Sequence, residues 1–552
     1  MDIRAIITEV TQKALKELDL EVGEVYLEHP ADLSYGDYST NIALVQAQRS
    51  GANPKELAEE ILRYIVQHKT EEIEKVEVAG PGFINFYVSQ NFFTNSIKEI
   101  LQKNEAWGKN QNLAGTKVMV EYTDPNPFKE FHIGHLMSNS IGESISRLIE
   151  FSDADVKRAN YYGDVGLHVA KAIWGKINSP ELSWGEAYAL GSAQYEDHKI
   201  EIDELNKKIY EKSDPNVNSL YVEGRKESLS LFEKIYKKLG TTFDFDFPES
   251  TTWRNGEVIV RENTKIFNES EGAIVFHGEN YGLHTRVFIT REGLPTYETK
   301  ELGLLQAKLE AYPFDTAITI TASEQKEYFK VVLAAAKQIE ELAEIAEKTV
   351  HITHGMMRLP TGKMSSRTGD VVAAGHLIEG VSTKVRGIIN ERDIEDKKTV
   401  AEQIAIGALK YWILKQATGR DIIFDEEKAL SFEGASGPYL QYAHTRAQSV
   451  LQKAGKKTMS TTLPENWNTT LLEKLLHRFP EIVERAGKEY EPHYVATYLT
   501  ELASAFGNFY AHERILDADE RERGYKLALV RAFQITMKNG LWLLGIEVPL
   551  RM

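Results

Sequence analysis

Apolar and polar positions in the middle of the chain follow two alternating periodicities. Residues 118–122 form a short apolar strand, and residues 136–149 place apolar side chains at helical spacing. Pro125 and Pro127 lie between these segments and forbid strand or helix there, so the chain must form a loop. Residues 159–168 repeat the change from strand to loop. This alternation predicts an α/β fold with a doubly wound parallel sheet, in which ligands bind beyond the carboxyl ends of the strands.

The flanking regions follow other patterns. The first 110 residues combine an amphipathic helix, residues 3–18, with a strand–turn–strand segment at residues 76–87, which predicts a small α+β domain. Residues 177–247 are charged and helical. The last part of the chain predicts an all-α bundle. We therefore expect four parts: residues 1–110, 111–355, 356–425 and 426–552.

Composition narrows the classes of function. The 552 residues contain no cysteine, which excludes disulfides and cysteine-ligated zinc. The net charge of −17 argues mildly against a nucleic-acid partner, although the local distribution of charge decides that question. No apolar run reaches membrane-spanning length, and residues 1–20 are typical of an amphipathic helix rather than a signal peptide. We therefore expect a cytoplasmic protein without a membrane partner.

Two histidines stand where the helix after the proline loop begins. His132 and His135 flank Gly134. A helix N-terminus offers unpaired N–H groups and a positive dipole end, which suits a phosphate, and glycine allows close approach to the backbone. The alternative is a surface loop with two solvated histidines, and this stretch alone does not decide between them.

A second stretch, residues 362–370, decides between these two interpretations. The combination of His132-Ile133-Gly134-His135 with the distal Lys363-Met364-Ser365-Ser366 resembles the paired signatures of class I aminoacyl-tRNA synthetases. The longer context, in which Pro125, Asn126 and Lys129 precede the histidines, resembles the arginyl-tRNA synthetase family specifically. The resemblance extends into both flanking parts and covers essentially the whole chain. It implies that the helical segment, about residues 177–247, is an insertion in the sheet.

The resemblance implies a Rossmann-like catalytic domain and a two-step reaction. Magnesium-bound ATP and L-arginine would give arginyl-adenylate, and the arginyl group would pass to its tRNA, without zinc. By this resemblance the catalytic residues are Lys129, His132, His135 and Lys363. The ATP-binding residues are these four with Gly134, Met364, Ser365, Ser366 and Arg367.

A third stretch supplies the arginine pocket. If Tyr297 begins a helix, Glu301 lies one turn further on the same face, and a phenol with a carboxylate can align a guanidinium. The family commonly has Asp where this chain has Glu301. The alternative is an exposed helical pair. By resemblance the arginine-binding residues are Asp124, Pro125, Asn126, His135, Tyr297, Glu301 and Gln325.

The chain departs from the usual pattern at two places. Most class I enzymes carry a lysine where this chain has Ser366, and we expect Lys129 on the facing loop to supply that charge, with Arg367 as a second candidate. The family often has Gln at position 168, where this chain has His168, whose role the sequence leaves open.

The C-terminal bundle carries aromatic residues that could contact tRNA. Residues 436–446 and 506–514 resemble the anticodon-binding domain of the family. The alternative for these segments is bundle core. By resemblance the residues that stack on anticodon bases are Tyr439, Tyr442, His444 and Tyr510. The expected partners are arginine tRNA, L-arginine and ATP, and we expect a monomer.

Three other functions share part of this sequence pattern. A class I lysyl enzyme shares the signatures and the lack of cysteine, and an amino-acid-dependent ATP assay separates it. A non-catalytic tRNA-binding paralogue is disfavoured by the intact histidines and lysines of the two signatures. A tRNA-independent nucleotidyltransferase with the histidine motif would not explain residues 426–552.

Overall fold

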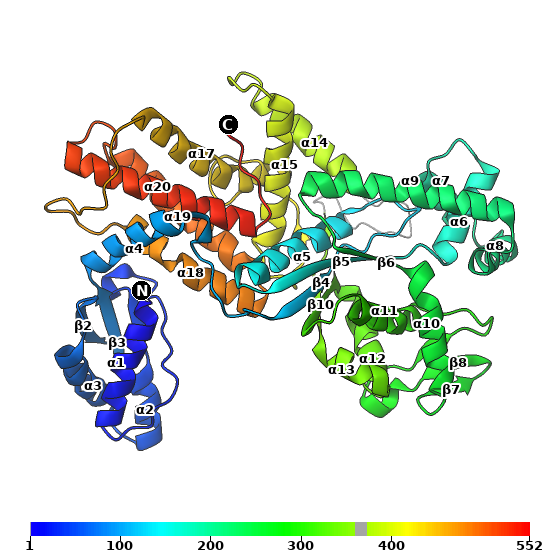
Figure 1. Cartoon of the computed structure of the whole chain (residues 1–552), viewed down its shortest axis with the longest axis horizontal. Coiled ribbons are helices and arrows are strands. Elements are labelled where there is room, and N and C mark those ends of the chain that lie inside the picture. The colour runs from blue at the N-terminus through cyan, green and yellow to red at the C-terminus, as the bar shows by residue number, and fades with distance from the viewer. Residues whose placement is uncertain (1, 359–372) are drawn as a thin grey trace. The chain divides into compact units, whose positions relative to one another are not determined.

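The computed structural model describes residues 2–358 and 373–552. The chain divides into two compact units, which we describe separately. The first unit comprises Met1–Trp107, Arg446–Pro480 and Glu501–Met537, and the second comprises Gly108–Thr445, Glu481–Thr500 and Lys538–Met552. Figure 1 traces the elements in chain order. Within the described ranges, no helix has both the length and the apolar character needed to cross a membrane.

A five-stranded parallel sheet forms the centre of the second unit. Its strands are β4 (Lys117–Glu121), β5 (Asp155–Tyr162), β6 (Phe245–Pro248), β10 (Thr316–Ala322) and β11 (Thr349–His354). Their order is β11-β10-β4-β5-β6, and every neighbouring pair is parallel. From β4, the strands β5 and β6 extend the sheet in one direction, and β10 and β11 extend it in the other. The predicted doubly wound sheet is therefore confirmed.

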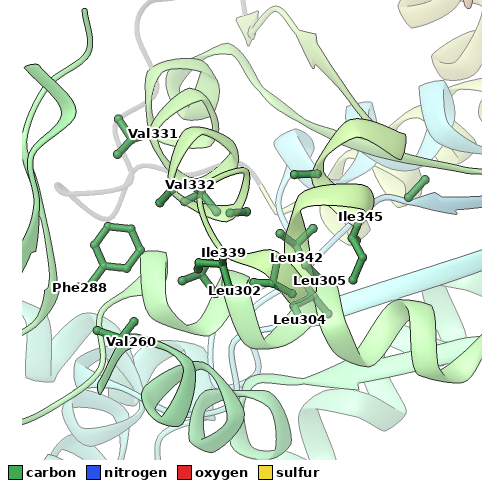
Figure 2. Close-up of a cluster of buried hydrophobic side chains, with 14 of the residues drawn as sticks. Val260, Phe288, Leu302, Leu304, Leu305, Val331, Val332, Ile339, Leu342 and Ile345 are labelled. Atoms are coloured by element: carbon green, nitrogen blue, oxygen red, sulfur yellow. The ribbon is translucent and has the colours of Figure 1, made fainter. Parts of the chain in front are cut away.

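Helices connect these strands. Those next to the sheet are α5 (Ile133–Phe151), α10 (Glu249–Glu262), α11 (Tyr297–Ala311), α12 (Lys326–Ala336) and α13 (Glu340–Lys348), whereas α6 (Leu167–Asn178) follows β5 and packs against the helices that come after it in the chain. A large apolar cluster holds α11, α12 and α13 against β10. Figure 2 shows Leu304 and Leu305 of α11 beside Leu342 of α13. This packing fixes α11, the helix that begins at Tyr297.

The helical insertion occupies the interval between β5 and β6. Its helices are α7 (Trp184–Ala193), α8 (Lys199–Glu211) and α9 (Pro215–Leu239). The end of the insertion, expected at about residue 247, is followed closely by β6 (Phe245–Pro248), which pairs with β5. The insertion is anchored to the sheet by Phe128, which is fully buried and lies edge-on to Trp184 at 5.2 Å between ring centroids.

Smaller elements complete the second unit. A three-stranded antiparallel sheet contains β7 (Phe267–Ser270), β8 (Ala273–Phe276) and β9 (Arg286–Ile289). A two-stranded parallel pair contains β12 (Met357–Arg358) and β13 (Ile422–Ile423). Further helices are η3 (Gly278–Tyr281), η4 (Ser323–Gln325), α14 (Ala374–Ile388), α15 (Lys397–Leu414) and α16 (Glu426–Ala429).

The first unit contains a small antiparallel sheet with strand order β1-β3-β2. Its strands are β1 (Tyr38–Thr40), β2 (Ile73–Ala79) and β3 (Phe83–Val88). Its N-terminal helices are α1 (Ile3–Glu17), η1 (Leu33–Tyr35), α2 (Ile42–Ser50), α3 (Pro54–His68), α4 (Gln90–Lys103) and η2 (Asn104–Ala106). Alternating buried residues of α1, α3 and β3 form one apolar core, as the predicted α+β domain requires.

Helices make up most of the C-terminal part, as predicted. They are α17 (Gly437–Ala454), α18 (Leu471–Glu489), α19 (His493–His512) and α20 (Glu520–Leu543). Within the first unit, the α18 residue Lys474 pairs with Asp37 at 2.8 Å, and His477 lies 3.2 Å from the Tyr38 hydroxyl. The N-terminal residues of this unit therefore make buried polar contacts with α18.

Candidate active site

The site lies where the strand order reverses. The loop 122–132 follows β4, the loop 163–166 follows β5, and η4 follows β10. Because neighbouring parallel strands end at the same edge, these three segments share the carboxyl edge of the sheet. The predicted position of both sequence loops at this edge is confirmed.

The loop after β4 is held in a strained backbone conformation. Thr123, Asp124 and Phe128 have φ angles of 84°, 48° and 70°, a left-handed region that residues other than glycine rarely adopt. Ser138 accepts the Thr123 N–H at 2.9 Å, and the Asn139 amide donates to the Thr123 hydroxyl at 3.0 Å. Both partners lie on α5, so hydrogen bonds to this helix stabilise the strained conformation. Strained backbone of this kind is typical of functional loops.

The two histidines form a stacked pair at the start of α5. Their ring centroids are 3.6 Å apart and the planes differ by 17°. The backbone N–H of Gly134 donates to Nδ1 of His132 at 3.1 Å, and the backbone N–H of His132 donates to Nδ1 of His135 at 3.2 Å. Both Nδ1 atoms are thus acceptors, so in each neutral ring the proton must lie on Nε2. The pair offers two parallel Nε2–H donors.

The surroundings keep both imidazoles neutral. Burial, together with the charge of Lys129, lowers the pKa of His132 to about 4. Burial also moves the pKa of His135 well below its usual value, with contributions from His132 and Lys129. At neutral pH each ring therefore acts as a fixed hydrogen-bond donor rather than as a titrating base.

The glycine between the histidines has a steric role. A Cβ atom at Gly134 would lie 2.9 Å from Cε1 and 3.0 Å from Nδ1 of His132. The ring of His132 thus folds over the backbone of Gly134. Any larger residue would displace the N-cap histidine, so the glycine is needed for the ring pair itself.

Lys129 lies on the strained loop near the histidines. Its ammonium is 4.8 Å from the ring centroid of Tyr188 in the insertion, a cation–π contact. Its side chain is half-buried, and its charge is among the causes that lower the pKa of His132 and His135. It is therefore close enough to contribute charge at the same site.

The second signature lies outside the described residues. This applies to Lys363, Met364, Ser365, Ser366 and Arg367. The first residues after it return to the histidine loop, since Ala374 donates its N–H to the Phe131 carbonyl at 2.8 Å and Ala373 bridges to His132. The chain thus re-enters the described region beside the stacked histidines.

Helix α11 presents a charged face to the same edge. It begins at Tyr297, as predicted, and Glu301 is only 4% exposed. The alternative of an exposed helical pair is therefore wrong for Glu301. Two turns further on, the fully buried Lys308 lies 2.8 Å from the carboxylate of Glu121, the last residue of β4. Tyr297 itself is 57% exposed, with the ammonium of Lys300 5.1 Å from its ring centroid.

The buried carboxylates hold their protons strongly. Burial, together with the negative charge of Glu121, raises the pKa of Glu301 to about 8. Burial and Glu121 also raise the pKa of Asp124 well above its usual range, although Asp124 accepts the Tyr161 N–H at 3.0 Å. A cation close to these groups would lower both pKa values.

The loop after β5 packs against the first loop. A Cβ at Gly163 would lie 2.6 Å from the Asn126 amide oxygen, so only glycine permits this approach. The buried His168 has Nε2 2.7 Å from the Gly163 carbonyl, which can only accept, so Nε2 carries the proton. Asp164 is fully buried and accepts from Arg225 of α9 at 2.8 Å. These contacts join the insertion to the site.

The structure adds residues that the sequence reasoning missed. Glu121 and Lys308 form one buried ion pair, and Glu249 and Lys300 form another at 2.6 Å. Glu121 could have been noticed as the polar end of an apolar strand. No pattern in the sequence marks Lys308, because its partner lies on a distant strand.

The other predicted residues differ in exposure. Pro125 is buried and Asn126 half-buried in the loop, whereas Gln325 is exposed on η4. In the second unit Tyr442 is half-buried with its ring edge-on to Phe432, and Tyr439 is half-buried on the same helix.

The other two residues predicted to contact tRNA are His444 and Tyr510. His444 is 5% exposed, so its ring is buried in this structure, and its stacking on a base stays a prediction. In the first unit Tyr510 is 40% exposed, with the Arg446 guanidinium 5.1 Å from its ring centroid. It is the most open of the four expected contacts.

The parallel sheet, with stacked histidines at the helix after its first strand, is the arrangement of a class I aminoacyl-tRNA synthetase. The family model described as "tRNA synthetases class I (R), catalytic domain" matches residues 96–426. The model of the "Arginyl tRNA synthetase N terminal domain" matches residues 1–88, and that of the "DALR anticodon binding domain" matches residues 440–552. The chain belongs to the arginyl-tRNA synthetase family.

Individual relatives agree along the full length. The arginine–tRNA ligase of Pediococcus pentosaceus is 30% identical over all of both chains, and that of Clostridium perfringens is 31% identical over all of both chains. The solved structure of Thermus thermophilus arginyl-tRNA synthetase has a TM-score of 0.82 at 25% identity and covers all of both chains. These comparisons confirm the predicted fold and family.

Proposed function

We propose that this chain ligates L-arginine to its tRNA with ATP, through an arginyl-adenylate. The observation that carries the proposal is the pairing of two features at one edge of the sheet. Two stacked histidines offer fixed donors for phosphate, and two buried glutamates, Glu121 and Glu301, offer charge to a cation. The full-length likeness to arginine–tRNA ligases supports it.

In the first step the arginine carboxylate attacks the α-phosphate of magnesium-bound ATP and pyrophosphate leaves. The Nε2–H groups of His132 and His135 donate to the phosphate oxygens, on which negative charge grows. Lys129 adds a positive charge from the same loop, and Lys363 is proposed to act with it. Because both rings are neutral and held by the backbone, they need no reorganisation during the reaction.

The arginine side chain is proposed to enter between β4 and α11. Its guanidinium would donate to Glu121 and Glu301, since a planar fork matches carboxylates, and Tyr297 would cover it. Pro125 and Asn126 would shape the site for the α-groups, with Asn126 held against Gly163. A lysine ammonium would satisfy fewer acceptors, which favours arginine over lysine as substrate.

In the second step the terminal ribose hydroxyl of the tRNA takes the arginyl group from the adenylate. The N-terminal α+β part and the C-terminal helices are proposed to hold the tRNA. Tyr439, Tyr442 and Tyr510 are the candidates for stacking on bases. We further propose that the chain works as a monomer in the cytoplasm and without zinc.

Aminoacylation of total tRNA with each of the twenty amino acids tests the function. Charging with arginine alone is expected, together with arginine-dependent ATP–pyrophosphate exchange that requires tRNA. Charging with lysine would establish a lysyl enzyme instead. Binding of tRNA without any charging would establish the non-catalytic paralogue.

A further inference from the structure

The arginine pocket contains more carboxylates than cations. Glu121 and Glu301 are 2% and 4% exposed, and Asp124 is half-buried on the loop after β4. Lys308 is the cation nearest to them, with Nζ 2.8 Å from Glu121 and 3.3 Å from the Thr319 hydroxyl. One ammonium therefore faces three acidic side chains.

Lys300, the next buried lysine, does not offset this excess of acidic side chains. Lys300 lies 2.6 Å from the carboxylate of Glu249, which is 2% exposed, so its charge is balanced locally. The remaining titratable groups that face Glu301 are the phenols of Tyr161 on β5 and Tyr328 on α12. Burial raises the pKa of both phenols well above the usual value, so they are neutral and bring no cation.

One carboxylate oxygen in this pocket has no partner. Within residues 2–358 and 373–552, Oε1 of Glu301 is buried and makes no hydrogen bond. An ionised carboxylate that is both buried and unpaired is costly, and such a group commonly becomes neutral instead. The same oxygen lies on the face of α11 that carries Tyr297 and Lys308, where a substrate side chain would meet it.

We propose that the empty pocket holds a proton on Glu301 and that the guanidinium of arginine expels this proton when it binds. The proposal rests on the proposed function, in which this site takes arginine. The guanidinium is already cationic and keeps its protons. The O–H bond of the Glu301 carboxyl breaks, the proton passes to solvent, and one positive charge replaces another in the pocket.

Two consequences follow from this exchange. Arginine and the proton compete for one site, so the apparent affinity for arginine falls as the pH falls. Because burial and Glu121 raise the pKa of Glu301 to about 8, the dissociation constant should rise about tenfold per pH unit below that value and level off above it. The empty pocket also avoids an uncompensated buried charge, which helps the free protein to stay folded.

Calorimetry of L-arginine binding to the full chain tests the exchange. Titrations at about pH 7 in buffers of low and high ionisation enthalpy measure the protons released. We expect close to one proton per arginine, and a dissociation constant that rises about tenfold for each unit of acidification from about pH 8 to about pH 6. Arginine binding with no proton release and no pH dependence would overturn the proposal.

Two variants sharpen this test. Glu301→Gln cannot ionise, so arginine should bind more weakly, with no proton released and no pH dependence in this range. Glu298→Gln is the matched control, because Glu298 is also a buried glutamate of α11 but is paired with Arg286 at 3.3 Å. It should retain the proton release. If Glu301→Gln does not fold, the pH dependence of the parent protein decides alone.

The result also distinguishes this proposal from the proposed function. A chain that neither binds arginine nor charges tRNA with it would overturn the function. A chain that charges tRNA with arginine but releases no proton on binding would overturn only the exchange.

Discussion

The guanidinium of Arg147 donates from Nη1 to the backbone carbonyl of Trp542 at 2.8 Å. Its Nη2 donates to the carbonyl of Gly240 at 3.1 Å, and its Nε to the buried Glu143 at 2.7 Å. Arg147 lies on α5, the helix that begins with the stacked histidines. One side chain thus caps the carboxyl ends of α9 and α20, where helix dipoles favour a cation.

We expect Arg147→Met to destabilise the second unit strongly. The substitution removes two caps and leaves Glu143 with the Tyr122 hydroxyl at 2.6 Å and a longer contact to Arg158 at 3.4 Å. Loss of one partner of a buried ion pair costs about 3–5 kcal/mol. Denaturant unfolding of the purified protein measures the change in the free energy of unfolding. The control is Arg485→Met, whose pair with Glu489 is exposed and should contribute less than about 1 kcal/mol. Equal effects of the two changes would contradict the assignment.

Lys129→Ala should depress adenylate formation by about 10²–10³. The lost contact is to phosphate, so arginine affinity should change little. Adding Ser366→Lys should restore part of the rate, because it returns the lysine that most class I enzymes carry at this position. The rate of adenylate formation in a single turnover is measured for the parent protein, for Lys129→Ala and for the double variant with Ser366→Lys. Lys199→Ala is the control, since Lys199 also lies over a tyrosine ring, Tyr195 at 5.3 Å, but on the insertion surface. A near-normal rate for Lys129→Ala would contradict this role of Lys129 and would leave Arg367 as the candidate for supplying the charge.

His168→Gln should make the protein less sensitive to acid. Burial moves the pKa of His168 well below 6.5, so below about pH 6.5 the unfolded chain binds a proton that the folded chain does not. Stability from this residue is therefore lost as the pH falls through that value. Glutamine binds no proton, so the difference in unfolding free energy between variant and parent should grow by about 1.4 kcal/mol per pH unit below that point.

Unfolding curves at several pH values measure this difference, in which other titrating groups cancel. His351→Gln provides an independent comparison, because burial lowers the pKa of His351 to about 4 and the same sign applies. Parallel pH profiles for parent and both variants would show that these rings are not the acid-sensitive groups.

Tyr510→Ala should weaken tRNA binding about tenfold, as expected for the loss of one aromatic–base stack. Tyr510 is exposed on α19, so its removal should leave folding intact. Filter binding or fluorescence titration with arginine tRNA measures the effect. Tyr281→Ala is the control, because Tyr281 is exposed to a similar degree on η3. Unchanged tRNA affinity for Tyr510→Ala would remove this residue from the interface.

Much of the catalytic edge could be predicted because its determinants are local. Pro125 and Pro127 exclude regular structure, and the apolar spacing of residues 136–149 specifies a helix, so strand, loop and helix follow from neighbouring residues. The helix that the arginine-pocket hypothesis assumes at Tyr297 also begins there. The histidine spacing of three residues likewise allows the capping arrangement of His132 and His135 within one turn.

Other features required contacts between distant segments. The position of His444 along the chain gave no sign of its burial, and in the structure it is 5% exposed. Residues 245–247 end the charged helical segment of the sequence, and pairing with β5 makes them a strand of the sheet. In both cases local composition was compatible with two outcomes, and the neighbouring element selected one of them.

By itself, the sequence determined the family, the order of strands and helices and the catalytic loop, because signatures and periodicities are short-range properties. Only the tertiary structure decided how charge is arranged around the arginine pocket. Glu121 and Lys308 meet because parallel packing brings the end of β4 beside α11, and Glu301 is buried because the apolar face of that helix packs into the core. Charge in a folded site depends on distance and burial, and neither quantity can be read from positions along the chain.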